Sequence, residues 1–339
     1  MSKSSESCLS VVVPAYNEGE GLRALHARLV PVLEALDVES RIVLVDDGSS
    51  DQTWAVMRDL AQADPRVETL KLARNFGKEL ALTAGLDHVR TGAAVVIDAD
   101  LQDPPELIPL FVERWRDGHD VVYGRRIRRA GESWLKRATA AAFYRLIGWL
   151  SPTPIPRDTG DFRLLSRRAL DALAGVRERQ RFMKGLFSWV GFRQCAIDYE
   201  REPRHAGRSR FNYWKLWNFA IEGITGFSTV PLRMATYVGL LTALVAFGFG
   251  VWIVAKTLLW GEPVAGYPSL MAAVLFLGGV QLIALGVIGE YLGRLYMESK
   301  QRPLYLVEEW CPASGDRTAT PSAVSSLAPM RSTGPGAPG

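Results

Sequence analysis

The chain has 339 residues, of which 48% are hydrophobic, and its formal net charge is +4. That small excess argues against a nucleic-acid-binding protein, which usually carries a denser basic face. The cysteines, Cys8, Cys195 and Cys311, show no ligand-like spacing and suit a reducing compartment.

The first 125 residues alternate short β-branched runs with amphipathic helical stretches. This pattern predicts strands at Leu9–Val13, Arg41–Val45, Val67–Lys71, Ala93–Ile97 and Asp120–Tyr123. Alternating strands and helices predict an α/β fold with a mostly parallel sheet, in which ligands bind beyond the carboxyl ends of the strands. Polar clusters follow the first four strands, at 14–18, 46–51, 74–78 and 98–100. We therefore expect four loops to meet at one edge of the sheet.

The pair Asp98 and Asp100 follows an apolar strand and precedes Gln102. Two carboxylates and an amide oxygen are ligands suited to Mg²⁺ or Mn²⁺, and such a cation could neutralise the charge of an anionic leaving group. An isolated Asp-x-Asp pair is most often a solvated turn, and the three other polar loops at the same edge favour the metal site.

Asp46 and Asp47 end the second predicted strand and could accept hydrogen bonds from a base or a ribose hydroxyl. The alternative is turn chemistry, because Asp-Gly-Ser is a strong turn sequence. The glycines at Gly19 and Gly21 imitate a dinucleotide fingerprint, but they fall five residues after the strand, inside or at the start of a helix. The position argues against an oxidoreductase.

Two stretches between the sheet and the C-terminal region, 134–150 and 211–227, are rich in apolar or aromatic residues at helical spacing. They are expected to lie at a membrane surface, with an ordinary packing face as the alternative. Next, Tyr237–Ala255 and Tyr267–Gly289 contain no charged side chain. Their lengths predict two transmembrane helices rather than helices of a soluble core.

The cations near the spans predict the topology. They are Arg204, Arg208, Arg210, Lys215 and Arg233 before the first span, and Arg294, Lys300 and Arg302 after the second. The positive-inside rule places both termini in the cytosol and the short connecting loop outside. The tail after Cys311 is rich in Pro, Ser, Ala, Thr and Gly and is expected to be disordered.

Five motifs together resemble glycosyltransferase family 2, and more closely its polyprenyl-phosphate glycosyltransferases, the group of bactoprenol glucosyltransferases and dolichyl-phosphate mannose synthases. The motifs lie at 12–18, 45–49, 74–79, 98–106 and 159–164, and the segments 289–294 and 300–303 resemble the two-span bacterial branch. The resemblance covers residues 8 to about 310.

The resemblance implies a GT-A fold and assigns site residues. The nucleotide-sugar site would contain Pro14, Ala15, Tyr16, Glu18, Asp46, Asp47, Lys78, Asp98 and Ala99, and the metal site Asp98, Asp100 and Gln102. Catalytic roles fall to Asp161, Asp100 and Arg125, and phosphate binding to Arg125, Arg204 and Arg210. The family commonly has lysine at position 210, where a guanidinium can still bind phosphate. The cluster at 204–210 could alternatively be a plain basic flank of the first span.

The expected organisation has five parts: a GT-A catalytic domain (1–203), a juxtamembrane basic loop and interfacial helix (204–233), two transmembrane helices (234–292), a cytosolic C-terminal segment (293–311) and a disordered tail (312–339). The predicted spans and the resemblance indicate a multi-pass protein of the bacterial cytoplasmic membrane, and the resemblance allows a homotetramer. The small net charge argues against a nucleic-acid partner.

The expected reaction is an inverting transfer of a sugar from a nucleotide-diphosphate sugar to a polyprenyl phosphate, with Mg²⁺ or Mn²⁺ as cofactor. Undecaprenyl phosphate and UDP-glucose are the first choices; GDP-mannose, a UDP-linked amino sugar and modified arabinose are alternative donors. A phosphate acceptor is already largely anionic at neutral pH, so a strong general base is hardly required. Asp161 could instead orient the acceptor. The remaining alternatives are a catalytically silent membrane scaffold and a soluble nucleotide-binding protein.

Overall fold

The computed structural model describes residues 8–127, 159–179, 181–200, 230–260 and 266–313. The strands of this part are β1 (Cys8–Ala15), β2 (Glu39–Asp46), β3 (Val67–Leu72), β4 (Ala93–Val96), β5 (Val121–Arg126), β6 (Thr159–Ser166), β7 (Gln194–Tyr199) and β8 (Val307–Cys311). The helices are α1 (Gly19–Glu34), α2 (Thr53–Ala63), α3 (Lys78–His88), the 3₁₀ turn η1 (Pro105–Leu107), α4 (Ile108–Arg116), α6 (Arg167–Gly175), α7 (Met183–Trp189), α9 (Val230–Trp260) and α10 (Tyr267–Ser299).

All eight strands form one sheet in the order β7-β5-β6-β4-β1-β2-β3-β8. The pairs β4–β1, β1–β2, β2–β3 and β5–β7 are parallel. Strands β6 and β8 pair antiparallel with their neighbours. The sheet confirms the predicted α/β fold, and it places the carboxyl ends of β1, β2, β3 and β4 along one edge.

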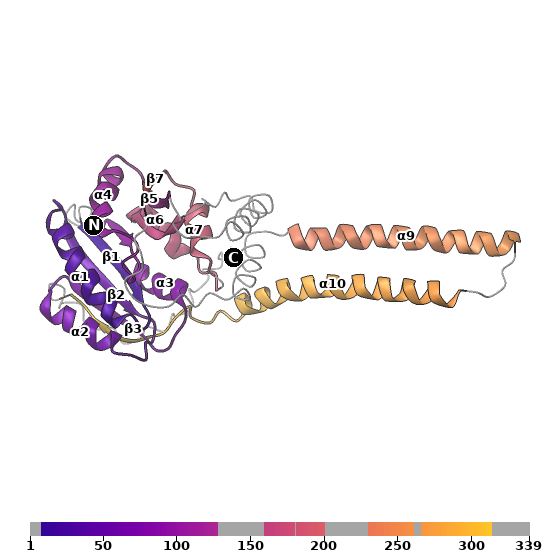
Figure 1. The fold of residues 1–339 in the computed structure, drawn as a ribbon, viewed down its shortest axis with the longest axis horizontal. Helices are drawn as coiled ribbons and strands as arrows, with labels where there is room; N and C mark the ends of the chain where they lie inside the picture. Colours follow the sequence, from indigo (N-terminus) through magenta and orange to yellow (C-terminus); the bar gives the residue numbers. More distant parts are fainter. Residues whose placement is uncertain (1–7, 128–158, 180, 201–229, 261–265, 314–339) are drawn as a thin grey trace, which may run out of the picture.

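The central strand β1 is buried along its whole length because helices cover both faces of the sheet (Figure 1). Successive side chains of a strand point to opposite faces. Val11 and Val13 accordingly belong to the core layer that also contains Leu22 and Leu25 of α1. Val12 belongs to the other layer, which contains Leu82 of α3.

The chain returns to this sheet after α10. Strand β8 pairs antiparallel with β3, and Ala73 N–H donates to the Leu306 carbonyl at 2.9 Å. Trp310 Nε1 donates to Glu68 Oε1 of β3 at 2.6 Å. The predicted C-terminal segment thus supplies the outer strand of the N-terminal sheet, because it covers the edge of β3 that would otherwise be open.

Helices α9 and α10 lie side by side as a long hairpin that projects away from the sheet (Figure 1). Both are long and apolar enough to cross a membrane, at Leu232–Trp252 and Phe276–Ser299, and neither stretch is buried within the protein. The second of these begins nine residues later than the sequence prediction, whereas α10 itself begins at the predicted Tyr267. Two exposed apolar helices of this length indicate association with a membrane.

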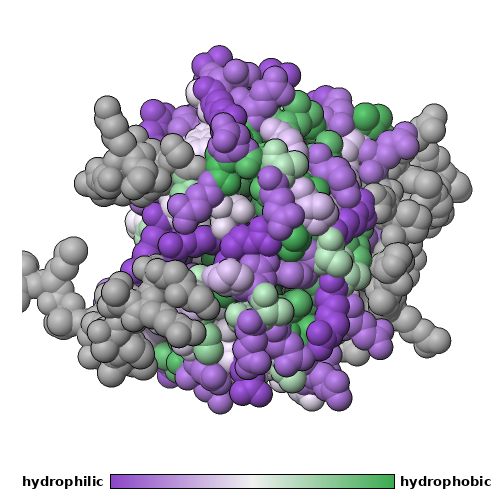
Figure 2. Space-filling view, turned by 90° about the vertical axis from the view of Figure 1, so that its left-hand side faces the viewer, coloured by the Kyte–Doolittle hydropathy of each residue, from purple (hydrophilic) through white to green (hydrophobic). Residues whose placement is uncertain are grey.

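The face of the domain opposite the hairpin is mostly hydrophilic, with scattered apolar residues (Figure 2). A surface of this composition is suited to water rather than lipid. The two stretches predicted to lie at the membrane surface, 134–150 and 211–227, and the tail after residue 313 lie outside the described residues.

Candidate active site

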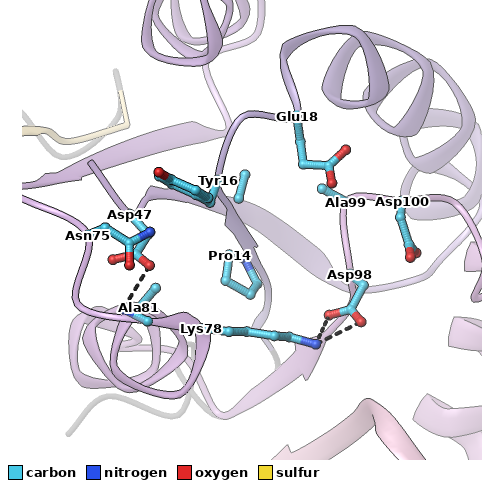
Figure 3. A pocket seen from close by; sticks show the side chains of 12 residues that line it. Pro14, Tyr16, Glu18, Asp47, Asn75, Lys78, Ala81, Asp98, Ala99 and Asp100 are labelled. Atoms are coloured by element: carbon cyan, nitrogen blue, oxygen red, sulfur yellow. Dashed lines mark hydrogen bonds and ion pairs between the residues drawn. The ribbon is translucent and has the colours of Figure 1, made fainter. Parts of the chain in front are cut away.

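A pocket with a volume of about 360 Å³ opens at the carboxyl ends of β1, β2 and β4 and at the start of α3 (Figure 3). The residues that line it are Pro14, Ala15, Tyr16, Glu18, Asp47, Asn75, Gly77, Lys78, Ala81, Asp98, Ala99 and Asp100. The four polar loops therefore meet, as the strand order requires. All the residues predicted for nucleotide-sugar binding lie in this lining, with the exception of Asp46.

The side chains around the pocket separate into two regions. In Figure 3, Tyr16 lies on the side of Asp47 and Asn75, whereas Glu18 and Asp100 lie on the opposite side. Lys78 extends along the pocket between them and ends at Asp98.

Lys78 joins two carboxylates from neighbouring strands. Its Nζ lies 2.7 Å from Asp98 Oδ1 and 2.8 Å from Asp98 Oδ2. The same Nζ lies 2.5 Å from Asp161 Oδ2. The register explains this meeting, because β4 and β6 pair antiparallel with Val96 opposite Arg163, so Asp98 comes opposite Asp161 two residues further on.

Charge dominates this part of the site. Burial opposes the charge of Asp161, but the cations Lys78, Lys184 and Arg163 outweigh it and hold the pKa of Asp161 well below its ordinary value. Burial also opposes the charge of Lys78, and there Asp98 and Asp161 hold the pKa above its ordinary value. Both groups are therefore ionised at neutral pH, so Asp161 is a weak base.

Glu79 follows Lys78 at the start of α3 and accepts a hydrogen bond from the Met183 N–H of α7 at 3.2 Å. Burial, and then the nearby charge of Asp161, raise the pKa of Glu79 to about 7. Lys184 lies beside Met183, and burial lowers its pKa against the attraction of Asp161. Glu79 and Lys184 thus extend the charged group around Lys78 toward α7.

The raised pKa of Glu79 predicts a pH-dependent stability. A carboxyl that binds its proton more tightly in the folded state stabilises the fold below its unfolded pKa, and this contribution is lost as the pH rises through about 7. The melting temperature of the wild type should therefore fall, relative to that of Glu79→Gln, between pH 5 and pH 8. Parallel melting curves for the two proteins across that range would contradict the assignment.

Asp46 and Asp47 differ in what they contact. Asp47 lines the pocket, and its carboxylate accepts hydrogen bonds from the Phe76 and Gly77 N–H groups at 2.7 and 2.9 Å. It therefore ties the loop after β2 to the loop after β3. Asp46 is fully buried and accepts from Ser49 N–H at 3.0 Å, so it closes the turn below the pocket. Burial raises the pKa of both carboxyls, against these hydrogen bonds.

Asp98 and Asp100, two of the three residues predicted to hold a metal, carry the carboxylate oxygens that a divalent cation prefers. Asp98 and Asp100 both line the pocket, and Asp161 Oδ1 is buried without a hydrogen-bond partner in the described ranges. Among the residues that the structure describes, no three His, Cys, Asp or Glu side chains form a group that could hold a metal ion. The protein would therefore contribute two carboxylates, and the donor diphosphate would complete the coordination. Gln102 does not line the pocket; its N–H donates to Asp100 Oδ1 at 3.2 Å.

The predicted phosphate-binding arginines are placed less directly. Arg125 does not line the pocket; it is half exposed and pairs with Asp198 of β7 through two hydrogen bonds of 2.5 and 2.8 Å. Arg204 and Arg210 lie outside the described residues. The phosphate-binding roles of all three stay predictions.

The neighbouring Arg126 is the inward-facing arginine of β5. Its Nε donates to Tyr199 Oη at 3.2 Å, and its Nη2 lies 3.6 Å from Asp103 Oδ1. A Cβ at Gly160 would lie 2.5 Å from Arg126 Nη2, so the guanidinium lies against the residue before Asp161. Strand alternation could have indicated that Arg125 and Arg126 face opposite ways, but the choice between them needs the position of β6. Asn75, Glu79 and Lys184 were also missed as site residues, although Asn75 and Glu79 both lie within the motif at 74–79.

Two family descriptions match the chain. Residues 10–174 match glycosyl transferase family 2, and residues 230–295 match the GtrB C-terminal hairpin. The first covers β1 to α6, including every residue that lines the pocket, and the second covers most of α9 and α10.

Several relatives match nearly the whole chain. The bactoprenol glucosyl transferase of Shigella phage SfV is 48% identical over 300 residues, which are 88% of this chain and 98% of that protein. An uncharacterized glycosyltransferase of Synechocystis is 51% identical over 89% of this chain and 95% of that protein. A prophage bactoprenol glucosyl transferase homolog of Escherichia coli K12 is 47% identical over 88% and 98%.

Proposed function

The chain belongs to glycosyltransferase family 2, and from that premise we propose that it transfers glucose from UDP-glucose to undecaprenyl phosphate at the cytoplasmic face of a bacterial inner membrane. The motif resemblance found in the sequence is confirmed by these relatives. The observation that carries the proposal is a polar pocket on a domain whose chain continues into an apolar hairpin. The Shigella phage SfV relative is a bactoprenol glucosyl transferase and the Escherichia coli relative is a homolog of one, which supports the acceptor and the sugar.

The pocket has places for both halves of the donor. The region around Tyr16 and Asp47 would hold the nucleoside, with the ring of Tyr16 available for stacking. Lys78 would bind the diphosphate, and Asp98 and Asp100 would hold Mg²⁺ or Mn²⁺ beside it. When bound, the metal would neutralise charge on the departing nucleoside diphosphate.

The proposed reaction is a single displacement at the anomeric carbon. A phosphate oxygen of the acceptor forms the new bond to C1 while the bond from C1 to the β-phosphate oxygen breaks, and the electron pair leaves with UDP. The configuration at C1 inverts. The low pKa of Asp161 supports a role in orienting the reactants rather than in accepting a proton.

The hairpin would bring the enzyme to its acceptor, whose polyprenyl chain stays in the bilayer. In the proposed topology Arg233, Arg294, Lys300 and Arg302 lie on the cytosolic side with the catalytic domain, and the end of α9 and the start of α10 lie on the opposite side. Holding donor and acceptor at one surface replaces a search in solution by an oriented encounter.

The homotetramer that the resemblance allows can be tested on the purified protein by light scattering.

Transfer of labelled sugar to undecaprenyl phosphate tests the proposal, with a panel of UDP and GDP sugars and either metal. We expect one donor to give a lipid-linked product. We expect Asp100→Asn to reduce its formation at least about 100-fold, the upper end of what is lost with supporting groups at metal sites. Asp117→Asn is the matched control, because Asp117 is half exposed and pairs with Arg114 at the end of α4.

Each outcome has a distinct meaning. Product from GDP-mannose alone would keep the reaction and change the donor. If Asp100→Asn and Asp117→Asn reduce product formation equally, Asp100 has no specific role at the site. No lipid-linked product from any donor, with a folded protein, would refute the proposed reaction and favour a silent scaffold.

A further inference from the structure

We propose that Lys78 neutralises the negative charge of Asp98 in the donor-free enzyme. When metal and donor bind together, Lys78 releases Asp98 to the divalent cation, and its ammonium group pairs with the donor diphosphate instead. The inference rests on the proposed function and adds that this one side chain couples metal binding to donor binding, beyond the direct contact between the metal and the diphosphate.

The contacts of Asp98 require such an exchange. Both of its carboxylate oxygens lie within 2.8 Å of Lys78 Nζ. A metal ion bound to either oxygen would lie next to the ammonium group, and two cations cannot share that space without strong repulsion. Metal binding at Asp98 therefore needs Lys78 to move.

Lys78 is placed to move, whereas its partners are not. The Lys78 side chain as a whole is 46% exposed, although its ammonium group is buried between the two carboxylates, whereas the side chains of Asp98 and Asp161 are 18% and 9% exposed. Lys78 is the first residue of α3 and lines the same pocket as Asp100. Its flexible stem can therefore turn the ammonium group within the pocket while the two carboxylates stay on their strands.

The surrounding charges make the exchange depend on the donor. Asp161 would keep the attraction of Lys184 and Arg163 after Lys78 leaves. Lys78 itself would lose two carboxylate contacts, and the donor diphosphate, proposed to bind in the pocket that Lys78 lines, is an anion that can replace them. A metal ion alone offers Lys78 no new partner, so metal should bind weakly without the donor and more tightly with it. Such a coupling is reciprocal.

The test measures Mn²⁺ affinity of the full-length purified protein in detergent, by calorimetry, with and without UDP. For the wild type we expect UDP to tighten Mn²⁺ binding by roughly ten-fold or more, within the usual range of coupling between two sites. For Lys78→Gln we expect Mn²⁺ alone to bind roughly ten-fold more tightly than to the wild type, and we expect UDP to tighten Mn²⁺ binding roughly ten-fold less than it does in the wild type. A merely structural lysine would not produce a gain in metal affinity.

Lys71→Gln is the matched control, because Lys71 pairs with Glu308 at 2.9 Å on the outer edge of the sheet. It should reproduce the wild-type values. If Lys78→Gln does not melt cooperatively, Lys78→Arg serves instead: a guanidinium can hold a carboxylate through two hydrogen bonds, so Mn²⁺ should bind more weakly than to the wild type.

The proposal is overturned if Lys78→Gln binds Mn²⁺ no more tightly than the wild type, if UDP tightens Mn²⁺ binding as much in that variant as in the wild type, or if Lys78→Arg equals the wild type. The proposed reaction would still stand after any of these results, provided that the wild type binds Mn²⁺ with UDP and forms product. If the wild type binds no Mn²⁺ even with UDP, the metal site of the proposed function fails and the exchange fails with it.

Discussion

Replacing Asp161 by asparagine is expected to lower the transfer rate by roughly a thousand-fold, the range seen when a group that stabilises a transition state is removed. The substitution keeps the shape of the side chain but removes the negative charge that Lys78 contacts at 2.5 Å. Lys78, Lys184 and Arg163 would then lack their shared carboxylate. The loss should appear in turnover, measured with labelled donor at saturating undecaprenyl phosphate, while UDP affinity changes by less than about ten-fold.

Asp171→Asn is the control for this experiment. Asp171 lies on α6 with its side chain 65% exposed and pairs with Arg167 one helical turn away, so its loss should leave turnover unchanged. A turnover of Asp161→Asn within about ten-fold of wild type would show that Asp161 is not needed for the displacement. Unfolding of the variant would appear as a lost melting transition and would be distinguished from a loss of chemistry.

Substitution of Gly48 by alanine should destabilise the protein by about 2–5 kcal/mol, the sum of the strain of a left-handed residue and the cost of overpacking. Gly48 has φ of +66°, and a Cβ there would lie 2.4 Å from the Arg74 carbonyl carbon and 2.7 Å from the Asn75 nitrogen. These are backbone atoms, so they cannot turn away as a side chain can. Because Asp47 precedes Gly48 and Asn75 lines the pocket, UDP binding should weaken as well.

The measurement is a melting curve followed by tryptophan fluorescence, with an expected decrease of about 5–15 °C. Gly175→Ala is the comparison, because Gly175 ends α6 at an ordinary φ and a Cβ there has no neighbour within 4 Å. That variant should melt at or slightly above the wild-type temperature. Equal melting temperatures for the two variants would show that the loop at 74–75 yields to the added methyl group.

The central sheet could be predicted from the sequence because its signals are local. β1 to β4 are apolar runs separated by helical periodicity, and parallel strands joined by helices place their loops at one edge. Strand β8 was not predicted, because Val307–Cys311 is short, contains two glutamates and follows an apolar helix. Only its pairing with β3 makes it a strand, and that pairing joins distant parts of the chain.

The residues of the site likewise include some that local sequence patterns indicate and others that depend on contacts between distant parts of the chain. Pro14, Tyr16, Asp47 and Asp98 follow strand ends directly, so the edge of the sheet brings them together. The contact between Lys78 and Asp161 joins residues 83 positions apart and depends on the antiparallel register of β6. Lys184, one of the cations that lower the pKa of Asp161, lies on α7, whose position no local pattern indicates. Sequence motifs therefore identified the pocket but not the ion network behind it.

The outer strand β8 also has a consequence for biosynthesis. Trp310 of β8 and its hydrogen-bond partner Glu68 of β3 are 242 residues apart, and the apolar helices α9 and α10 lie between them. At ordinary translation rates, roughly 10–50 s therefore pass between the synthesis of β3 and that of β8. The ribosome must release the whole hairpin first, so the sheet receives its last strand only after the apolar helices are available to the bilayer. Completion of the enzyme would then follow its arrival at the membrane.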